Sequence, residues 1–298
     1  FRPHGPPAMN YVLTLVADRA ATTLDAATVA EIADATGAGP AETLSPGEAV
    51  DLPCPAPPPP AAIAAILGAR PIDVFCLPVA GRRKRLLAAD MDSTIITCEV
   101  IDELAAEAGI GAEIAAITAR SMAGEIDFAT ALRDRVARLR DTRLTALDRV
   151  AARLRCTEGA RELIATMRAH GAVTALISGG FTFFTARIAE CLGFSAHFAN
   201  RLQDDGQVLT GTVTEPVLDR DAKERILREL AQRHAIPLAE TMAIGDGAND
   251  LAMLATAGLG IAFRAKPLVA DAARARIIHG TLRAALFAQG YRLSEFRE

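Results

Sequence analysis

A short apolar run that ends in two acids occupies residues 86–94, Leu86-Leu87-Ala88-Ala89-Asp90-Met91-Asp92-Ser93-Thr94. Side chains alternate along a strand, so Asp90 and Asp92 would point the same way if the strand continued to them. At the carboxyl end of a parallel strand, that direction can be the ligand-binding edge of an open α/β sheet. Two crowded carboxylates repel each other unless a cation lies between them or one keeps its proton. The stretch therefore fits either a nucleophile and a general acid beside a metal ion, or a solvated turn after a strand.

A second strand-like run, residues 242–245, leads into Gly245-Asp246-Gly247-Ala248-Asn249-Asp250. The glycines permit a tight turn and a close approach of the backbone to a ligand. Asp246 and Asp250 supply hard oxygen ligands of the kind that Mg²⁺ prefers. The alternative is a glycine-rich turn in which Asn249 or Asp250 caps the following helix.

Together the two stretches resemble the first and last signature motifs of the haloacid-dehalogenase-like phosphohydrolases. The two remaining motifs of that family occur between them in the family's order. One is Ser178-Gly179-Gly180-Phe181, which follows the predicted strand 173–177, and the other is Lys223, at the start of a helix predicted at 222–232. The glycine-containing motifs look like the phosphoserine phosphatase branch in particular, and the resemblance covers roughly residues 86–289.

Strands that alternate with helices predict an α/β fold with a doubly wound, mostly parallel, Rossmann-like sheet. We expect the catalytic core in residues 81–96 and 156–298, and a helical cap in residues 97–155. The cap is expected because the two neighbouring core strands are too far apart in sequence for one crossover helix. Its predicted helices are 99–108, 111–122, 127–138 and 145–153. Further along the core, residues 196–203 and 207–213 are predicted to form a hairpin.

A small α/β domain, similar to the ACT-like domain that precedes the core in some relatives of this family, is expected at residues 9–80. Its predicted strands are 11–17, 49–52 and 73–79, and its predicted helices are 24–36 and 61–67. Two interpretations stay open: the domain binds an amino acid, or it is a packing or dimerising domain that would give a homodimer. Residues 1–8 precede Met9 and lack the apolar centre of a signal peptide, so we expect a vector-derived remnant there.

The resemblance implies that Asp90 attacks phosphorus and becomes an aspartyl phosphate. Asp92 then acts as general acid for the departing alcohol and as general base for the water that hydrolyses the intermediate. Mg²⁺ is the implied cofactor, held by the carboxylates of Asp90 and Asp246 and by the backbone carbonyl of Asp92. Related cation pumps have Lys in place of Met91 and Thr in place of Asp92, and their phosphoenzyme persists; Asp92 here favours rapid hydrolysis.

The same resemblance implies a phosphate site formed by Ser178, the Gly179 amide and Lys223. Asn249 is expected to contact the phosphate or the polar end of the substrate. Asp250 is expected to support the site by orienting Lys223 or a metal-bound water.

Substrate selection is assigned by the resemblance to the cap. Glu99 would bind the ammonium group of the substrate, and Arg135 would bind its carboxylate through a bidentate fork. Met122 and Phe128 would form an apolar wall that excludes water. The alternative for Glu99 and Arg135 is that they are exposed helix charges.

Composition excludes several other classes of protein. The 298 residues carry a net charge of only −4 and no long basic block, which argues against a nucleic-acid partner. No apolar run reaches the length that a membrane span needs. The five cysteines are scattered, which favours a reducing, cytoplasmic location over a disulfide framework or a zinc site.

The implied activity is that of a Mg²⁺-dependent phosphoserine phosphatase, which hydrolyses O-phospho-L-serine as the last step of L-serine biosynthesis. One alternative is a phosphotransferase that passes the phosphoryl group to another alcohol, such as homoserine. The other alternative is a regulatory protein whose front domain senses an amino acid.

Overall fold

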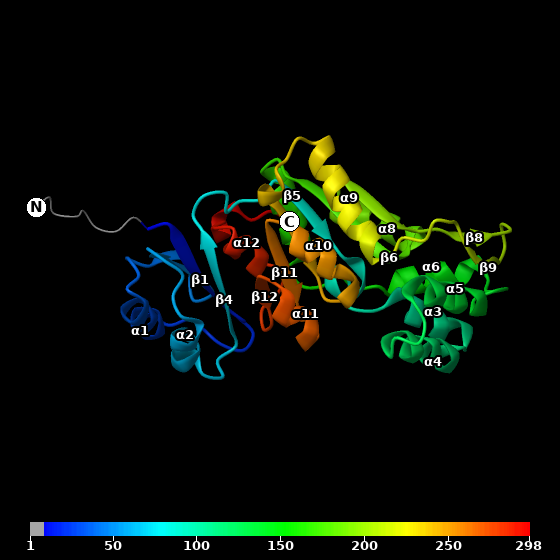
Figure 1. Cartoon of the computed structure of the whole chain (residues 1–298), viewed down its shortest axis with the longest axis horizontal. Helices are drawn as coiled ribbons and strands as arrows, with labels where there is room; N and C mark the ends of the chain where they lie inside the picture. Colours follow the sequence, from blue (N-terminus) through cyan, green and yellow to red (C-terminus); the bar gives the residue numbers. More distant parts are fainter. Residues whose placement is uncertain (1–8) are drawn as a thin grey trace, which may run out of the picture.

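The computed structural model describes residues 9–298. The expectation for residues 1–8 lies outside the described residues. The chain forms three parts in a row: an N-terminal α/β unit, a central sheet covered by helices, and a group of helices at the far end (Figure 1).

The N-terminal unit has a four-stranded antiparallel sheet in the order β2-β3-β1-β4. Its elements are β1 (Tyr11–Ala17), α1 (Ala26–Thr36), β2 (Glu42–Ser45), β3 (Ala49–Cys54), α2 (Pro60–Leu67) and β4 (Ile72–Pro78). The succession βαββαβ is that of the split βαβ motif. The three predicted strands and two predicted helices are confirmed, while β2, a four-residue edge strand, was not predicted.

The N-terminal unit is held to the core by buried polar contacts. Asp73 is 3% exposed, and its carboxylate accepts hydrogen bonds from the backbone amides of Ile278 (2.8 Å), His279 (3.1 Å) and Gly280 (2.8 Å). Arg82 pairs with Asp51 of β3 and also donates to the carbonyl oxygen of Ala288, at 2.8 Å. Buried charges with several partners fix the relative position of two surfaces, because breaking one contact leaves an unpaired charge.

The central sheet has six parallel strands in the order β12-β11-β10-β5-β6-β7. The strands are β5 (Leu86–Ala89), β6 (Val173–Phe181), β7 (Ala196–Asn200), β10 (Thr241–Gly245), β11 (Leu259–Phe263) and β12 (Ala275–Ile277). Within this sheet the chain enters at β5, continues through β6 to β7 at one edge, and then returns to the other side of β5 at β10. The strand order therefore reverses between β5 and β10, and ligands of such sheets bind at this switch point.

Helices cover both faces of the central sheet (Figure 1), as expected for a doubly wound fold. On one face lie α7 (Ala160–Ala169), α8 (Thr182–Leu192) and α12 (Ala284–Ala288), and on the other α9 (Arg220–Arg233), α10 (Leu251–Thr256) and α11 (Pro267–Ala272). Alternate residues of β5 serve the two faces: Leu87 packs on the first side and Leu86 on the second. The predicted α/β class with a parallel sheet is confirmed.

The helical insertion lies between β5 and β6 and consists of α3 (Val100–Ala108), α4 (Gly111–Met122), α5 (Phe128–Arg138) and α6 (Leu144–Arg153). All four predicted helices are confirmed to within a residue or two. The segments that enter and leave the insertion lie side by side at its base, where Ile96 and Cys156 form a β-bridge.

The hairpin prediction was partly wrong. The predicted strand 196–203 is divided: β7 pairs in parallel with β6, and the hairpin itself is made by β8 (Leu202–Asp204) and β9 (Leu209–Val213). The division comes at Asn200, the last residue of β7, whose side chain hydrogen-bonds to Gly179 of β6 and to Leu218, which follows the hairpin. The hairpin then lies against the helical insertion, where the Asp141 amide donates to the Leu209 carbonyl at 2.9 Å.

No helix within residues 9–298 combines the length and the apolar character that crossing a bilayer requires.

Candidate active site

Asp90 is placed by the strand that precedes it. All four residues of β5 are buried, and the backbone amide of Asp90 donates to the carbonyl oxygen of Ile244 in the neighbouring β10, at 2.9 Å. Asp90 and Asp246 therefore follow adjacent parallel strands at the switch point of the sheet. Asp90 is 5% exposed, and its side chain accepts a hydrogen bond from the Met91 amide at 2.7 Å.

Asp92 is held by two hydrogen bonds after the chain turns away from the sheet. Its Oδ1 accepts from the Val100 amide at 2.8 Å, and its Oδ2 accepts from the Ser178 hydroxyl at 2.9 Å. Burial, with the charge of Glu99, raises the pKa of Asp92 to about 7, although both hydrogen bonds favour the ionised form. A carboxyl group with this pKa can give and accept a proton near neutral pH.

The loop Ser178-Gly179-Gly180 ends the regular part of β6 beside Asp92. The Gly180 amide donates to Ser178 Oγ at 2.8 Å, so this hydroxyl accepts from the loop while it donates to Asp92. A Cβ at Gly180 would lie 2.9 Å from Asp92 Oδ2, which explains the need for glycine there. The edge of the Phe128 ring, from α5 of the helical insertion, faces the neighbouring Gly179.

Lys223 lies in the first turn of α9 and reaches back to the sheet. Its Nζ is 2.8 Å from Asp90 Oδ1 and 2.7 Å from Asp250 Oδ1, and the side chain is 1% exposed. Burial opposes the charge of Lys223, but the two carboxylates raise its pKa above the ordinary value and keep it protonated. Burial and the charge of Asp250 raise the pKa of Asp90 well above its ordinary value, against the opposite effect of Lys223.

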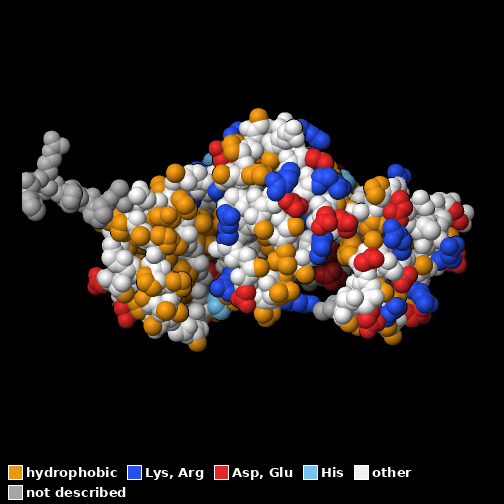
Figure 2. Space-filling view, viewed as in Figure 1, with side chains coloured by type: hydrophobic (Ala, Val, Ile, Leu, Met, Phe, Trp, Pro, Cys, Tyr) orange, Lys and Arg blue, Asp and Glu red, His pale blue; other side chains and the backbone are white. Residues whose placement is uncertain are grey.

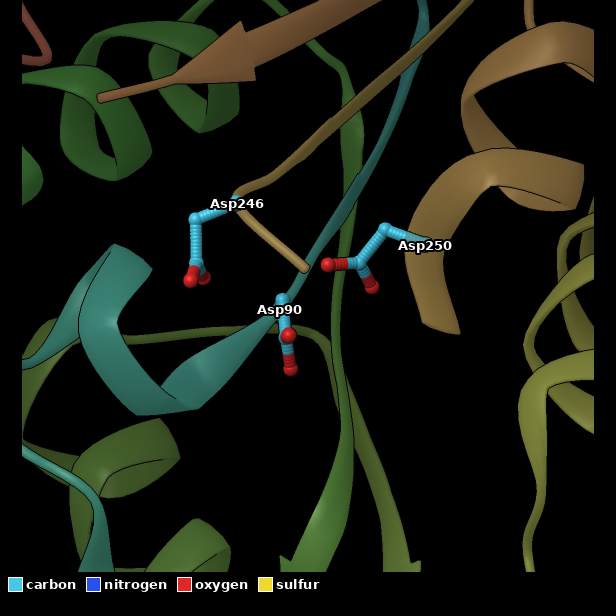
Figure 3. A group of neighbouring side chains, drawn as sticks. All are labelled: Asp90, Asp246 and Asp250. Carbon is cyan, nitrogen blue, oxygen red and sulfur yellow. The ribbon is translucent and has the colours of Figure 1, made fainter. Parts of the chain in front are cut away.

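Three carboxylates meet at this edge of the sheet. One oxygen from each of Asp90, Asp246 and Asp250 lies within 4.8 Å of the others, and Asp246 and Asp250 flank Asp90 in Figure 3. Burial raises the pKa of Asp246 to about 6, although the Thr94 hydroxyl donates to its Oδ1 at 2.8 Å. Crowded carboxylates with raised pKa values are stabilised by a cation, and oxygen donors suit a hard divalent ion such as Mg²⁺.

Within this acidic cluster, Asp250 differs from the other two. Its Oδ1 accepts from Lys223 and its Oδ2 accepts from the Gly247 amide at 3.0 Å, and the residue is 0% exposed. Because both oxygens already have donors, Asp250 fits an anchor for Lys223 better than a metal ligand. Asp90 and Asp246 are the carboxylates of the cluster that fit a cation. Figure 2 shows acidic side chains set back in the hollow where the core meets the helical insertion.

The residues expected to select the substrate lie on or before the helical insertion. Glu99 is exposed at the start of α3 and accepts a hydrogen bond from Ser93 Oγ at 2.7 Å. Arg135 of α5 is half-buried, and its Nε donates to the carbonyl oxygen of Ala131 at 3.2 Å. Burial lowers the pKa of Arg135, and the charges of Asp102 and Glu99 act in the opposite direction.

Two further residues expected in the site are Met122 and Asn249. Met122 ends α4, but its side chain lies outside the described part of the chain. Asn249 is half-buried in the short turn between β10 and α10, beside Gly247.

Two residues with clear contacts in the site were given no role from sequence. Thr94 is fully buried and binds Asp246, as described above. Asn200 donates from Nδ2 to the carbonyl oxygen of Gly179 at 2.9 Å. Thr94 had a signal, since it lies four residues after Asp90 in the same motif, whereas the sequence around Asn200 carries none.

The chain is similar in sequence to a family of hydrolases and to several curated proteins. The sequence profile of the haloacid dehalogenase-like hydrolases matches residues 84–258. The phosphoserine phosphatase of Archaeoglobus fulgidus is 44% identical over 192 residues, which are 64% of this chain and 56% of that protein. The chain spans about half the length of the first curated relatives it matches, namely 56%, 48% and 52%.

Two solved structures extend these likenesses. A haloacid dehalogenase family hydrolase of Salmonella enterica serovar Typhi matches with a TM-score of 0.85 and 29% identity, over 94% of this chain and 98% of that one. A substrate-bound phosphoserine phosphatase complex matches with a TM-score of 0.65 and 41% identity, over 69% of this chain and 98% of that one. The first likeness includes the N-terminal unit, and the second covers a smaller part of the chain.

Proposed function

Since the chain belongs to the haloacid dehalogenase-like hydrolases, we propose that it is a Mg²⁺-dependent phosphoserine phosphatase, which hydrolyses O-phospho-L-serine to L-serine and phosphate. The observation that carries this proposal is the buried group of Asp90, Lys223 and Asp250 beside Asp246 and Asp92. The name of the Archaeoglobus relative and the substrate-bound complex support the choice of substrate. We further propose that the reaction completes L-serine biosynthesis in the cytoplasm, a location that the scattered cysteines favour.

In the proposed reaction, the Asp90 carboxylate attacks phosphorus and forms an aspartyl phosphate, while the bond from phosphorus to the serine oxygen breaks. Asp92 gives its proton to that oxygen and then takes a proton from the water that hydrolyses the intermediate. A pKa of about 7 supports both roles, because neither protonation state of Asp92 is rare near neutral pH.

Mg²⁺, when bound, would neutralise phosphate charge and keep Asp90 ionised, held by the carboxylates of Asp90 and Asp246 and the carbonyl of Asp92. Ser178, the Gly179 amide and Lys223 would hold the phosphate oxygens, and Asn249 would bind the phosphate or the polar end of the substrate. The position of the Lys223 ammonium supports this role, because the group is held by Asp250 and also contacts Asp90, the proposed nucleophile. A positive charge at this place stabilises the negative charge of the transition state.

We propose that residues 97–155 form a cap on a catalytic core made of residues 81–96 and 156–298. In the cap, Arg135 would bind the substrate carboxylate and Glu99 its ammonium group, beside an apolar wall of Phe128 and Met122. The contact of Phe128 with Gly179 supports a cap that reaches the phosphate loop.

The N-terminal unit, residues 9–80, is proposed to be a packing domain that takes part in a homodimer. Its fixed attachment through Asp73 and Arg82 supports packing over a mobile sensor. Hydrophobic side chains gather on the visible face of this unit in Figure 2, which favours contact with a second copy. The βαββαβ order also fits an ACT-like domain, so amino-acid binding is the alternative. Light scattering tests the dimer, and titration with amino acids other than L-serine, the proposed product, tests the alternative.

The proposed activity is tested by measuring phosphate release from O-phospho-L-serine and from a panel of other phosphoesters, with Mg²⁺ and with EDTA. We expect kcat/KM for phosphoserine to exceed that for simple phosphoesters by roughly 100-fold, and EDTA to abolish turnover. Similar rates across the panel would overturn the substrate assignment. Formation of a new phosphoester when another alcohol is added would instead favour the phosphotransferase.

A further inference from the structure

Asn200 is a buried polar residue that none of the roles above uses. It ends β7, lies opposite Phe181 of β6 in the parallel pairing, and is 3% exposed. A buried amide side chain loses its hydrogen bonds to water, so both its oxygen and its nitrogen need partners in the protein.

The partners of Asn200 are two backbone segments that meet at the site. Its Nδ2 donates to the carbonyl oxygen of Gly179 at 2.9 Å, and more weakly to that of Leu218 at 3.4 Å. Its Oδ1 accepts from the Leu218 amide at 2.7 Å. The reversed amide would set its NH₂ group against an N–H and its oxygen against a carbonyl, so these contacts define the orientation.

At the Gly179 end, the contact fixes a peptide unit that continues to Asp92. The carbonyl of Gly179 and the amide of Gly180 belong to one planar peptide group. That amide donates to Ser178 Oγ at 2.8 Å, and Ser178 Oγ donates to Asp92 Oδ2 at 2.9 Å. A continuous chain of hydrogen bonds therefore runs from Asn200 through the phosphate loop to Asp92. Members of such a chain polarise and orient one another.

At the Leu218 end, the contact fixes the start of α9. Leu218 directly precedes Asp219, whose side chain caps the helix by accepting from the Ala222 amide at 2.9 Å. Lys223 follows in the same turn, so the Leu218 backbone sets where the Lys223 ammonium can reach.

We propose that Asn200 is a positioning residue, which fixes the phosphate loop and the Lys223 end of α9 to each other so that their donors converge on one phosphoryl group. This role rests on the proposed phosphatase activity. It is independent of the part of the substrate beyond phosphate, because both segments are proposed to hold the phosphoryl group and not the amino acid. Asn is suited to the position because one contact needs a donor and the other an acceptor.

The test compares Asn200→Leu, which keeps the size and removes both contacts, with Asn200→Asp, which keeps the acceptor for Leu218 and sets a second acceptor against Gly179. We expect kcat/KM to fall about tenfold in Asn200→Leu and about 100-fold in Asn200→Asp, mostly through kcat. The loss should be the same for phosphoserine and for para-nitrophenyl phosphate. Asn10→Leu, at an exposed position in the N-terminal unit, is the matched control and should leave both rates unchanged.

A double-mutant cycle with Ser178→Ala separates positioning from a merely structural role. If Asn200 acts through the Ser178 hydroxyl, the two losses will not add, whereas independent effects multiply in rate. Additive losses, or a lower melting temperature with unchanged kcat/KM, would overturn the proposal. If Asn200→Leu does not fold, Asn200→Asp carries the same comparison.

The affinity for inorganic phosphate, measured by calorimetry with Mg²⁺ present, distinguishes failure of this role from failure of the proposed function. We expect both Asn200 variants to bind phosphate about tenfold more weakly than the wild type. If the wild type does not hydrolyse phosphoserine but the Asn200 variants still bind phosphate more weakly than it does, the substrate assignment is rejected and the role of Asn200 stands. Phosphate affinity and aryl-phosphate turnover that both match the wild type would reject the role of Asn200.

Discussion

The edge of the Phe128 ring faces Gly179: a Cβ built on Gly179 would be 3.0 Å from the Cζ atom of Phe128 and 3.6 Å from its Cε2 atom. Phe128 begins α5 of the helical insertion, and Gly179 belongs to the loop at the end of β6. The missing side chain at position 179 therefore sets how closely the helical insertion approaches the core.

Gly179→Ala should separate these two residues, because the added methyl group is closer to the ring than ordinary contact allows. We expect kcat/KM for phosphoserine to fall about tenfold, and Phe128→Leu in the same chain to restore part of the loss. Gly111→Ala is the matched control, since a Cβ there meets nothing within 4 Å. A loss that Phe128→Leu does not reduce would show that the methyl group acts on the phosphate and not on the ring.

Asp90→Asn should abolish turnover, because an amide does not attack phosphorus. The fold should persist, since Lys223 keeps its contact with Asp250 at 2.7 Å. We expect kcat to fall by more than about 10⁴-fold with little change in the melting temperature. Substantial phosphatase activity in this variant, without deamidation back to Asp as checked by mass spectrometry, would show that another group is the nucleophile.

Asp92→Asn should slow the reaction according to the leaving group. An alkoxide such as that of serine needs a proton, so we expect the rate of enzyme phosphorylation to fall about 10³-fold with phosphoserine. Para-nitrophenolate leaves without a proton, and its first step should slow about tenfold or less. Rapid-quench measurement of the phosphoenzyme gives both rates. Equal losses for the two substrates would count against Asp92 as the proton donor.

Mg²⁺ should stabilise the protein more at high pH than at low pH. Burial raises the pKa of Asp92 to about 7 and that of Asp246 to about 6, so the folded metal-free protein binds protons more tightly than the unfolded chain. Its stability must then fall as pH rises from about 5 to about 7. Mg²⁺ binds the ionised carboxylates, so its effect on the melting temperature should be larger at about pH 8 than at about pH 5.5.

The comparison is between melting temperatures with EDTA and with excess MgCl₂ at each pH. Asp246→Asn removes one ionising group and one ligand, so it should reduce both the pH dependence and the effect of Mg²⁺. An equal effect of Mg²⁺ at the two pH values would contradict an ion bound by these carboxylates.

Arg135→Ala should reduce kcat/KM for phosphoserine by about 30- to 1000-fold, an effect of roughly 2–4 kcal/mol from loss of a charge-assisted fork. The same change should hardly affect para-nitrophenyl phosphate, which has no carboxylate. Arg135→Lys should restore only part of the loss, because an ammonium group does not reproduce the planar fork. Arg138→Ala, an exposed residue of the same helix that pairs with Glu113, is the control. Equal losses on both substrates would show that Arg135 supports the helical insertion instead.

The location of the candidate site could largely be predicted from the sequence, because ligands of an open parallel sheet bind at the carboxyl ends of its strands. Asp90, Ser178 and Asp246 each follow a buried apolar run, and the carboxyl ends of parallel strands meet at one edge of a sheet. The helices of the insertion were predictable as well, since their apolar residues recur with helical spacing.

The contacts within the site depend on long-range packing and could not be predicted in this way. The partners of Asn200 lie 21 and 18 positions away, and the alternation of apolar and polar residues around it, in residues 196–203, predicts a single strand. Asp250 could be assigned a supporting position from the motif, but only the structure shows that Lys223 and the Gly247 amide use both of its oxygens. Local patterns specify elements and their ends, whereas hydrogen-bond partners depend on which ends meet.

The buried Asp73 carboxylate ties together parts of the chain made at very different times. Its amide partners lie 205 to 207 residues further along the sequence. During synthesis the N-terminal unit emerges before the segment around Gly280, so Asp73 lacks these amide partners until that segment has left the ribosome. The N-terminal unit therefore cannot dock through Asp73 until the segment around Gly280 has been made, so its sheet gains these contacts later than the strand pairings within the sheet itself.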